Sequence, residues 1–504
     1  MATNPYPPPL QSKGRKAPPP DPVLLQPHMV ARGKTLPKAR SGIAGLDEIT
    51  FGGLPAGRPT LVCGSAGSGK TMLAIEFLVC GAMEYGEPGV MVCFEETADD
   101  LAANVRSLGF DLNKLIAEDK LRIEYVHIER SEIEETGEYD LEGLFIRVGH
   151  AVEAIGAKRV VLDTLEALFA GLPSHGILRA ELRRLFRWLK DRHLTAVITG
   201  ERDGNALTRY GLEEFVADCV ILLDHRIDRQ ISMRRLRIVK YRGSAHGTDE
   251  YPFLIGARGL SILPITSLTL DHAVSTARLS SGIPALDDML GAKGFYRGSS
   301  VLVTGSAGTG KSSLAMTFAD SSCRRGERCL VFAYEESAAQ ILRNMRSIGL
   351  DLERWVKSGA LQIHAARPTV QGLEQHLLAI RDLVAELKPT VVIIDPISNL
   401  TFDESTQGLL KSMLMRVIDT LKQVGITALF TSLADHGASI EYGQVGTSSL
   451  MDTWVVLELD PAAANHTRSL YVLKSRGMAQ SHEIRPFEFG ASGMKVAKAT
   501  RRRK

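Results

Sequence analysis

The chain carries the stretch Gly64–Thr71, G-S-A-G-S-G-K-T, directly after the apolar run Thr60–Cys63. It fits the phosphate-binding loop pattern G-x-x-x-x-G-K-[ST] at every fixed position, and a helix-like segment, Met72–Val79, follows it. Glycines let successive backbone N–H groups point at phosphate oxygens, and the start of a helix adds partial positive charge there. The stretch therefore predicts a strand, a phosphate-binding loop and a helix.

Within this loop, Lys70 is expected to reach the β- and γ-phosphates of a nucleotide, and the Thr71 hydroxyl is expected to ligate Mg²⁺. The whole loop is expected to bind the nucleotide, through Gly64, Ser65, Ala66, Gly67, Ser68, Gly69, Lys70 and Thr71. A plain glycine-rich turn is the alternative for one copy.

A second copy, Gly305–Ser312 (G-S-A-G-T-G-K-S), follows the apolar run Ser300–Thr304. Its predicted nucleotide-binding residues are Gly305, Ser306, Ala307, Gly308, Thr309, Gly310, Lys311 and Ser312, the last also as a Mg²⁺ ligand. Because the same loop occurs twice, the plain-turn interpretation becomes negligible. The chain is organised around two nucleotide sites.

Other segments recur at a spacing of about 230 to 240 residues. Ser41–Asp47 returns as Ser281–Asp287, and the acidic pairs and strand-like runs discussed below repeat in the same order. A repeat this long indicates duplicated domains rather than a solenoid, whose units are 20 to 50 residues. We expect a first lobe at residues 41–273 and a second at residues 274–490.

Composition is that of an ordinary globular protein: 504 residues, 44% hydrophobic, 23% charged, formal net charge +2. The six cysteines form no C-x-x-C pair and the thirteen histidines lack ligand spacing, so neither a disulfide framework nor a metal cage is indicated. No apolar run approaches 18 residues, and prolines occupy the N-terminus where a signal peptide needs an apolar core. We expect a cytoplasmic protein without a membrane partner.

Both ends of the chain are basic. Residues 1–40 hold ten prolines and seven Lys or Arg against one acidic residue, Asp21, and are expected to be a disordered arm. Residues 491–504 end in Arg501–Lys504 and are expected to be a solvated basic tail. A docking role for the N-terminal arm is the less favoured alternative.

Short Val-, Ile- and Leu-rich runs alternate with amphipathic helical patterns in each lobe. Arg159–Asp163, for example, precedes a helical pattern at Leu178–Lys190 and a further apolar run at Leu194–Thr199. Apolar strands without alternation, each followed by a helix, indicate a mostly parallel sheet covered by helices on both faces. The predicted class is α/β, with ligands at the carboxyl ends of the strands.

Acidic residues follow the predicted strands. Asp163 and Asp395 end apolar runs and are expected to hold Mg²⁺, the role of the strand-ending acid in phosphate-loop ATPases; a turn residue is the alternative. Two acidic pairs follow the neighbouring strands, and either member is a candidate to orient or deprotonate the attacking nucleophile. The pairs are Glu95 with Glu96, and Glu335 with Glu336. A helix that starts at Thr97 as its N-cap would favour acidic residues in its first turn, which explains Asp99 and Asp100. It does not explain a glutamate pair that precedes the cap.

A basic segment closes each lobe. In the first lobe the candidates are Lys240, Tyr241, Arg242, Ser244 and His246. In the second lobe they are Arg468, Lys474 and Arg476. They fit either a solvated edge strand or cations that reach the nucleotide of a neighbouring subunit, and their spacing alone does not decide.

With these elements assembled, residues Ser41 to Phe489 resemble the KaiC family of clock ATPases and autokinases in the RecA superfamily. The motifs include F-E-E-T at Phe94, Y-E-E-S at Tyr334, Leu342–Asn344 and the K-x-R-G segments. The resemblance implies two tandem RecA-like phosphate-loop domains, ATP as cofactor, and a homohexamer with ATP between subunits. It favours the trans role of the basic segments, although Met478 and Gln480 depart from the family's pattern.

The resemblance also implies phosphorylation of a hydroxyl pair in the second lobe, which falls on Ser448 and Ser449. Because Asp452 matches Asp218, the corresponding first-lobe residues are Glu214 and Phe215, which cannot accept a phosphoryl group. The first lobe is thus expected only to hydrolyse ATP, and the second to autophosphorylate as well. A polar turn is the alternative for Ser448 and Ser449.

The resemblance allows a KaiB-like partner, whereas the short segment after Phe489 argues against a KaiA-like one. A self-sustained clock and a simpler timer or stress signal fit equally. Two other functions were weighed: a RecA-like nucleic-acid motor, disfavoured by the net charge of +2, and an ATP-dependent scaffold without kinase activity, disfavoured by intact catalytic positions in both lobes. The absence of H-R-D and D-F-G motifs excludes a eukaryotic-type kinase.

Overall fold

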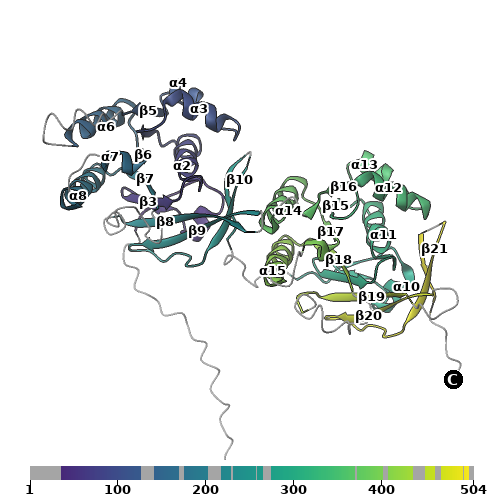
Figure 1. Cartoon of the computed structure of the whole chain (residues 1–504). Coiled ribbons are helices and arrows are strands. Elements are labelled where there is room, and N and C mark those ends of the chain that lie inside the picture. The colour runs from purple at the N-terminus through teal and green to yellow at the C-terminus, as the bar shows by residue number, and fades with distance from the viewer. Residues whose placement is uncertain are drawn as a thin grey trace, which may run out of the picture.

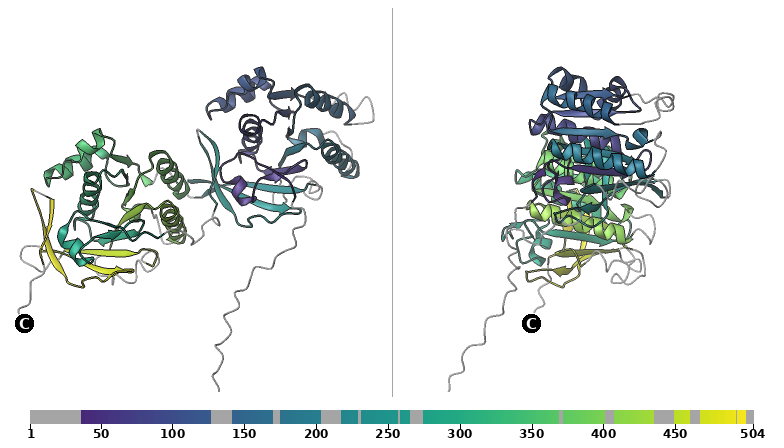
Figure 2. Two further views of the ribbon diagram at one scale, coloured as in Figure 1. Left: turned by 180° about the vertical axis from the view of Figure 1, so that it is seen from behind. Right: turned by 90° about the vertical axis from the view of Figure 1, so that its left-hand side faces the viewer.

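A computed structural model of the chain describes most residues of both lobes. The described ranges are 36–126, 141–169, 175–202, 217–228, 231–256, 258–264, 274–368, 372–400, 407–434, 449–459, 467–491 and 493–498. Figure 1 shows the described residues as two α/β lobes side by side, and Figure 2 shows them from behind and from one side.

The first lobe is built on one sheet with strand order β11-β10-β9-β8-β3-β7-β6-β4-β5. Its elements are β1 (Lys38–Ala39), α1 (Leu46–Ile49), β2 (Leu54–Pro55), β3 (Pro59–Gly64), α2 (Lys70–Glu84), β4 (Gly89–Cys93), α3 (Ala98–Arg106), α4 (Leu112–Ala117), β5 (Leu121–Tyr125), α6 (Glu142–Ile155), β6 (Arg159–Asp163), α7 (Leu165–Phe169), α8 (His175–Asp191), β7 (Thr195–Glu201), β8 (Cys219–Asp228), β9 (Ile231–Tyr241), β10 (Tyr251–Gly256) and β11 (Gly259–Ile262).

The second lobe repeats this topology, with strand order β16-β15-β17-β18-β14-β19-β20-β21-β22. Its elements are β12 (Arg278–Leu279), α10 (Pro284–Met289), β13 (Phe295–Tyr296), β14 (Ser300–Gly305), α11 (Lys311–Arg324), β15 (Cys329–Ala333), α12 (Ala338–Ser347), α13 (Glu353–Lys357), β16 (Leu361–Ala365), α14 (Leu373–Leu387), β17 (Val391–Asp395), the 3-10 helix η2 (Ile397–Leu400), α15 (Gln407–Gln423), β18 (Thr427–Leu433), β19 (Thr453–Leu459), β20 (Arg468–Ser475), β21 (Arg485–Gly490) and β22 (Gly493–Val496).

Six strands of each sheet are parallel, and the three strands at one edge are antiparallel. In the first lobe β3 lies between β7 and β8, both parallel to it, whereas β9, β10 and β11 form an antiparallel extension. Every residue of β3, β4 and β6 is buried, because helices cover both faces of these strands. The predicted mostly parallel sheet with helices on both faces is confirmed in both lobes.

Each sheet has two hydrophobic cores, one on each face. In the first lobe, one core joins α2, α3 and α4 to the sheet, and the other joins α6 and α8 to it. The second lobe has the same arrangement, with α11 on one face and α14 and α15 on the other. The six cysteines are free thiols, and all six are buried.

The two lobes of one chain contact each other through β9, β10 and α14. Figure 1 shows α14 and α15 on the side of the second lobe that faces β10. Arg235 on β9 forms an ion pair with Glu374 on α14, with 3.1 Å between Nη2 and Oε1. Leu263, just after β11, is buried in the core of the second lobe. None of the helices that the structure describes has the length and apolarity needed to cross a membrane.

Candidate nucleotide-binding sites

Each phosphate-loop motif forms the turn between a central strand and a helix. The loop of the first lobe joins β3 to α2, and that of the second joins β14 to α11. Gly69 and Gly310 precede the helices with φ of 103° and 101°, a conformation that glycine adopts without strain. The loops therefore lie at the carboxyl ends of parallel strands, next to helix N-termini.

The lysine of each motif folds back over its own loop. The Lys70 ammonium donates to the carbonyl oxygens of Gly64 and Ser65, at 2.9 and 3.1 Å. The Lys311 ammonium donates to those of Gly305 and Ser306, at 2.9 and 2.8 Å. A cation is thus held against the carbonyl oxygens at the start of each loop, next to the N-terminus of the following helix.

The hydroxyl residue of each loop meets the strand-ending aspartate. Thr71 Oγ1 donates to Asp163 Oδ2 at 2.8 Å, and the other Asp163 oxygen accepts from Thr199 on β7. In the second lobe, Ser312 and Thr431 both donate to Asp395. The sequence predicted the two hydroxyl–aspartate pairs, but not the threonines on the adjacent strands that orient the carboxylates.

Hydroxyl and carboxylate oxygens are hard donors, and Mg²⁺ is commonly held by one or two such protein groups together with substrate phosphates and water. The Thr71–Asp163 pair and the Ser312–Asp395 pair fit this ion, because both lie at the end of a phosphate loop. No group of three or more His, Cys, Asp or Glu side chains suited to a metal occurs within the described ranges.

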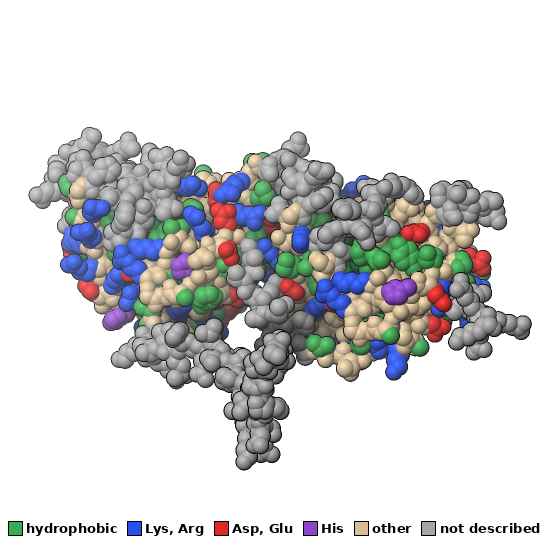
Figure 3. Space-filling view, turned by 90° about the horizontal axis from the view of Figure 1, so that it is seen from below, with side chains coloured by type: hydrophobic (Ala, Val, Ile, Leu, Met, Phe, Trp, Pro, Cys, Tyr) green, Lys and Arg blue, Asp and Glu red, His purple; other side chains and the backbone are tan. Residues whose placement is uncertain are grey.

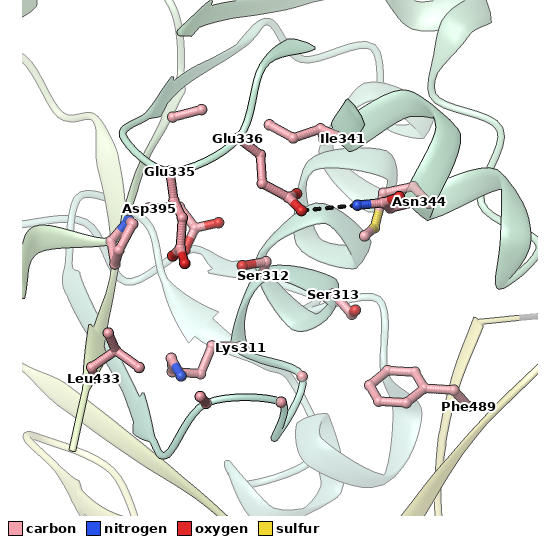
Figure 4. A pocket seen from close by; sticks show the side chains of 16 residues that line it. Lys311, Ser312, Ser313, Glu335, Glu336, Ile341, Asn344, Asp395, Leu433 and Phe489 are labelled. Atoms are coloured by element: carbon pink, nitrogen blue, oxygen red, sulfur yellow. Dashed lines mark hydrogen bonds between the residues drawn. The ribbon is translucent and has the colours of Figure 1, made fainter. Parts of the chain in front are cut away.

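The two glutamates of each pair have different environments. In the first lobe Glu96 accepts from Asn104 on α3 at 3.2 Å, whereas Glu95 accepts from Thr164, next to Asp163, at 3.4 Å. In the second lobe Glu336 accepts from Asn344 on α12 at 2.9 Å. Figure 4 shows Glu335 pointing toward Asp395 and Ser312 instead. The first glutamate of each pair is thus turned toward the strand-ending aspartate or the residue beside it, and the second is held by an asparagine.

The helices that carry these asparagines begin with the predicted cap. The Thr97 hydroxyl accepts from the Asp100 N–H at 3.3 Å at the start of α3. Ser337 forms a full capping box with Gln340 at the start of α12. Each cap fixes the start of the helix directly after the glutamate pair, so the distance from the second glutamate to the asparagine eight residues later, about two turns, is also fixed.

A cavity of about 350 Å³ lies between the phosphate loop and the glutamate pair of the second lobe (Figure 4). Its wall includes Phe489 from β21, whose ring packs against the loop so closely that a Cβ on Gly310 would lie 2.4 Å from it. The lining residues are Ala307, Gly308, Gly310, Lys311, Ser312, Ser313, Ala333, Glu335, Glu336, Ile341, Asn344, Met345, Asp395, Pro396, Leu433 and Phe489.

Burial changes the titration of two groups in this cavity. It lowers the pKa of the Lys311 ammonium, and the charges of Asp395 and Glu335 act in the opposite direction. Burial also raises the pKa of Asp395, although hydrogen bonds from Thr431 and Ser312 and the charge of Lys311 lower it. The two groups are thus electrostatically coupled, and each favours the charged form of the other.

The basic segments lie at the opposite edge of the sheet from their own phosphate loops. Lys240 pairs with Val220 at the start of β8, which runs parallel to β3, so it lies level with the start of β3 rather than with its Gly64 end. Lys474 occupies the same place next to β19. The register places these lysines level with Leu61 and Leu302, three residues before Gly64 and Gly305. Three residues of strand correspond to about 10 Å, and the lysines also lie two strands away, so they are remote from the loop of their own lobe.

The residues that follow these lysines surround an aspartate. Arg242 forms an ion pair with Asp218 at 3.9 Å, and Arg476 forms one with Asp452 at 4.0 Å. Lys190 also approaches Asp218, at 2.5 Å. Each aspartate therefore fixes the start of the basic loop against the sheet edge.

The other residues predicted to bind nucleotide from the basic segments are Tyr241, Ser244, His246 and Arg468. Tyr241 is buried and its hydroxyl donates to the Gly53 carbonyl at 2.9 Å, while His246 stacks on its ring. The exposed Ser244 hydroxyl donates to the Ala245 carbonyl. Arg468 is the exception, because it begins β20 on the phosphate-loop side, where its Nε donates to the Gly308 carbonyl of its own lobe at 3.4 Å.

The two residues that depart from the family pattern face their own lobe. Met478 packs against the core of the second lobe, with its sulfur 3.2 Å from an Arg278 guanidinium nitrogen. Gln480 donates to the Leu473 carbonyl at 3.3 Å. Their side chains are therefore engaged within the chain.

The candidate acceptor Ser449 is exposed and lies at the same edge as Arg476. The Arg476 guanidinium donates to the Ser449 carbonyl at 2.8 Å. Ser448 falls outside the described residues, as do Glu214 and Phe215 of the first lobe. Ser449 therefore lies on the side of the second lobe opposite its own phosphate loop.

Two sheets of this topology, each with a phosphate loop, a strand-ending aspartate and a glutamate pair, define a protein with two tandem RecA-like phosphate-loop domains. The family model described as "ATPase: KaiC" matches residues 39–267 and again residues 279–501. The chain therefore belongs to the KaiC ATPase family, and each lobe is one KaiC-type ATPase domain.

Curated relatives match over nearly the whole chain. The chain is 55% identical to the circadian clock protein KaiC2 of Synechocystis over 470 residues, which cover 92% of this chain and 82% of that protein. It is 38% identical to the circadian clock oscillator protein KaiC of Synechococcus elongatus over 475 residues, which cover 93% and 91%. The KaiC of Parathermosynechococcus lividus is 39% identical over 464 residues.

Proposed function

We propose that the chain is a Mg²⁺- and ATP-dependent ATPase and serine/threonine autokinase that acts as a hexameric timing or signalling protein in the cytoplasm. The lobe at residues 41–273 hydrolyses ATP. The lobe at residues 274–490 hydrolyses ATP and also transfers the γ-phosphoryl group to Ser448 or Ser449. The observation that carries the proposal is the position of Ser449 at the sheet edge remote from its own phosphate loop.

In the transfer step, Glu335 accepts the proton of a serine hydroxyl while the serine oxygen forms a bond to the γ-phosphorus. The bond from that phosphorus to the β–γ bridging oxygen breaks, and its electron pair leaves with ADP. Lys311 and the loop N–H groups stabilise charge on the phosphate oxygens. Hydrolysis follows the same course with water as nucleophile. Glu95 is the corresponding base in the first lobe, because it holds the position of Glu335 and accepts from Thr164 beside Asp163, whereas Glu96 and Glu336 are held by asparagines.

Mg²⁺, held at Thr71 with Asp163 and at Ser312 with Asp395, neutralises charge on the β- and γ-phosphates when it is bound. Those oxygen pairs are 2.8 Å apart in the first lobe and hydrogen-bonded in the second. Their carboxylates are oriented by Thr199 and Thr431. The protein's part is to present the ligands at the mouth of the loop.

The placement of the basic segments and the phosphate loops at opposite edges of each sheet supports a head-to-tail ring. Lys240, Arg242, Lys474, Arg476 and Ser449 lie on one edge, and the loops of the same lobes lie on the other. If one subunit places its basic edge over the loop edge of the next, every nucleotide receives cations in trans. Figure 3 views the chain from below and shows Lys and Arg side chains exposed on both lobes.

The relatives named clock proteins support a timing role, and a KaiB-like protein is the partner that this role favours. On the face in Figure 3 basic and acidic side chains are interspersed, which does not favour a nucleic-acid partner.

The proposal is tested by incubating the full chain with Mg-ATP and measuring ADP release together with the mass of the peptide that contains Ser448 and Ser449. We expect one or two added phosphates on this peptide, and none on the Ser448→Ala/Ser449→Ala variant. Continued ADP release with no added phosphate would refute the autokinase and leave the ATPase.

A further inference from the structure

A second cavity, of about 200 Å³, lies on the other side of the glutamate pair in the second lobe. It shares Ala333, Glu335 and Glu336 with the nucleotide cavity, and its remaining wall includes Tyr334 and Arg367. Glu335 is therefore placed between two cavities, one of which opens on the phosphate loop. In phosphoryl transfer the acceptor approaches opposite the leaving group, so the base must contact a space on the side away from the nucleotide.

Two buried aromatic residues, Tyr334 and His376, support the wall of this second cavity. Tyr334 is 4% exposed and its ring meets that of His376 on α14 edge-on, with 5.0 Å between the ring centroids. His376 is 2% exposed and hydrogen-bonded to the backbone of Pro368, the residue after Arg367. The buried imidazole thus links the residue before Glu335 to the residue after Arg367.

The corresponding residues of the first lobe are apolar. Phe94 takes the place of Tyr334, and Leu144 on α6 takes that of His376; both belong to one hydrophobic core. The polar brace is therefore a feature of the second lobe, the lobe to which we assign phosphoryl transfer.

Arg367 is the cation of the second cavity. It follows β16, its side chain is exposed, and within the described part of the chain it has no hydrogen bond or ion pair. A guanidinium can hold a carboxylate or phosphate through two parallel hydrogen bonds. The second cavity is therefore lined by the proposed base Glu335, by the buried Tyr334 that packs on His376, and by the anion-binding group of Arg367.

We propose that this second cavity is the acceptor side of the transfer site, and that Arg367 holds an acidic or phosphorylated residue next to the acceptor serine. The inference rests on the proposed autokinase function and deepens it, because it names the substrate class: a serine-bearing segment with a negative charge beside the acceptor. In an adjacent serine pair, the first phosphate is that charge, so Arg367 favours the second transfer over the first.

The chemistry of the second transfer is that of the first. The free serine oxygen bonds to the γ-phosphorus, its proton passes to Glu335, and ADP leaves with the electron pair of the broken bridging bond. Arg367 touches the neighbouring phosphate and takes no part in bond formation, so it is a specificity residue.

The test uses the full chain with Arg367→Ala, and Arg328→Ala as the matched control. Arg328 is an exposed arginine of the same lobe that precedes β15, at the opposite edge of the sheet. We expect Arg367→Ala to slow the appearance of the doubly phosphorylated Ser448–Ser449 peptide by about ten-fold or more, as expected for loss of a charge-assisted hydrogen bond. The first phosphate and ATP hydrolysis should change less than about two-fold, and Arg328→Ala should change none of the three.

Two substrate sources are separated by supplying synthetic peptides to the Ser448→Ala/Ser449→Ala variant. Labelling of an acidic-flanked serine peptide, lost with Arg367→Ala, would identify other proteins as substrates. No labelling of the peptide by this variant, together with labelling of Ser448 or Ser449 in the parent chain, would identify the protein's own serines as the substrate.

A binding measurement separates failure of this inference from failure of the proposed function. The singly phosphorylated peptide of residues 447–453 is titrated against the Ser448→Ala/Ser449→Ala variant, with and without Arg367→Ala. If this binding requires Arg367 while the parent chain adds no phosphate to Ser448 or Ser449, the autokinase is refuted and the anion-binding role of the second cavity is kept. Equal binding and equal rates of second transfer in the two variants would refute the role of Arg367.

Discussion

The two glutamates of each pair are adjacent in sequence but differ in what they contact. Glu336 receives the amide of Asn344, whereas Glu335 is turned toward Asp395 and Ser312 (Figure 4). A carboxylate that already accepts a hydrogen bond from a fixed asparagine is oriented by the protein, and the other is placed to receive a proton. Residue spacing treats both glutamates alike, so only the structure separates them.

We therefore expect Glu335→Gln to lower phosphoryl transfer to Ser448 and Ser449 by about 10² to 10³-fold, the contribution of general base catalysis. Glu336→Gln keeps a side-chain oxygen that can accept from Asn344, and should lower transfer by less than about ten-fold. Both variants should retain ATP hydrolysis in the first lobe. The measurement is the initial rate of phosphopeptide formation at saturating ATP. An equal loss in the two variants would contradict the assignment of the base.

A second residue-scale feature is the carboxyl group of Glu76 on α2, which is 4% exposed and accepts from the Leu260 N–H at 2.6 Å. Burial raises the pKa of Glu76 to about 7, although this hydrogen bond lowers it. The folded protein then holds a proton that the unfolded chain releases above about pH 4.5. Folding stability should therefore fall as the pH rises from about 4.5 to 7.

Glu76→Gln removes this titration. We expect the variant to be more stable than the parent above pH 7, by up to about 3 kcal/mol, with the difference shrinking toward pH 4.5. Denaturant unfolding of the full chain at pH 5, 6, 7 and 8 measures it. A difference that does not change with pH would show that Glu76 titrates normally.

At the scale of elements, the phosphate loop of the second lobe is closed by a strand from the far edge of the sheet. Phe489 on β21 packs on Gly310, and Arg468 at the start of β20 donates to Gly308. In the first lobe Ile255 on β10 packs on Gly69 in the same way. The antiparallel extension of each sheet thus forms one wall of the nucleotide site.

Gly310→Ala and Gly308→Ala separate this contact from backbone strain. Both glycines have positive φ, of 101° and 76°, so alanine strains both, but only at Gly310 would the new Cβ meet Phe489, at 2.4 Å. We expect Gly310→Ala to weaken ATP binding more than Gly308→Ala, and Phe489→Ala to restore part of the loss. Titration with ATP on a Lys70→Ala background reports the second site alone. An equal loss of ATP affinity in Gly310→Ala and Gly308→Ala would show that the Phe489 contact does not contribute to ATP binding.

Local patterns predicted most of this architecture. The loops, the strand-ending aspartates and the cap at Thr97 are read within a few residues of sequence, because strand, turn and helix-start chemistry are local. The contacts of Phe489 and Arg468 with the loop were not predicted, because they join segments about 160 to 180 residues apart through the register of antiparallel strands. Asn344 stood in a quoted motif, but its partner became visible only once α12 was placed.

At the scale of the whole molecule, each lobe presents a phosphate loop on one edge and a basic segment on the other. The sequence showed both groups but left open whether the basic segment was a solvated edge or a contribution to a neighbouring site. The strand register places Lys240 and Lys474 about 10 Å along the strands from their own loops, and two strands to the side. This geometry supports the proposed ring of subunits, in which the basic segment of one lobe reaches the loop of the next subunit.

The most direct test of this account mixes two defective subunits in one assembly. Lys311→Ala removes the loop lysine of the second lobe but keeps its serines, and Ser448→Ala/Ser449→Ala keeps the loop but removes the acceptors. Each alone should remain unphosphorylated, and co-expression should place phosphate on Ser448 or Ser449 of the Lys311→Ala subunit, identified by a mass tag. Transfer between subunits would be contradicted if the parent chain, which has both the loop lysine and the serines, is phosphorylated while the mixture of the two variants carries no phosphate.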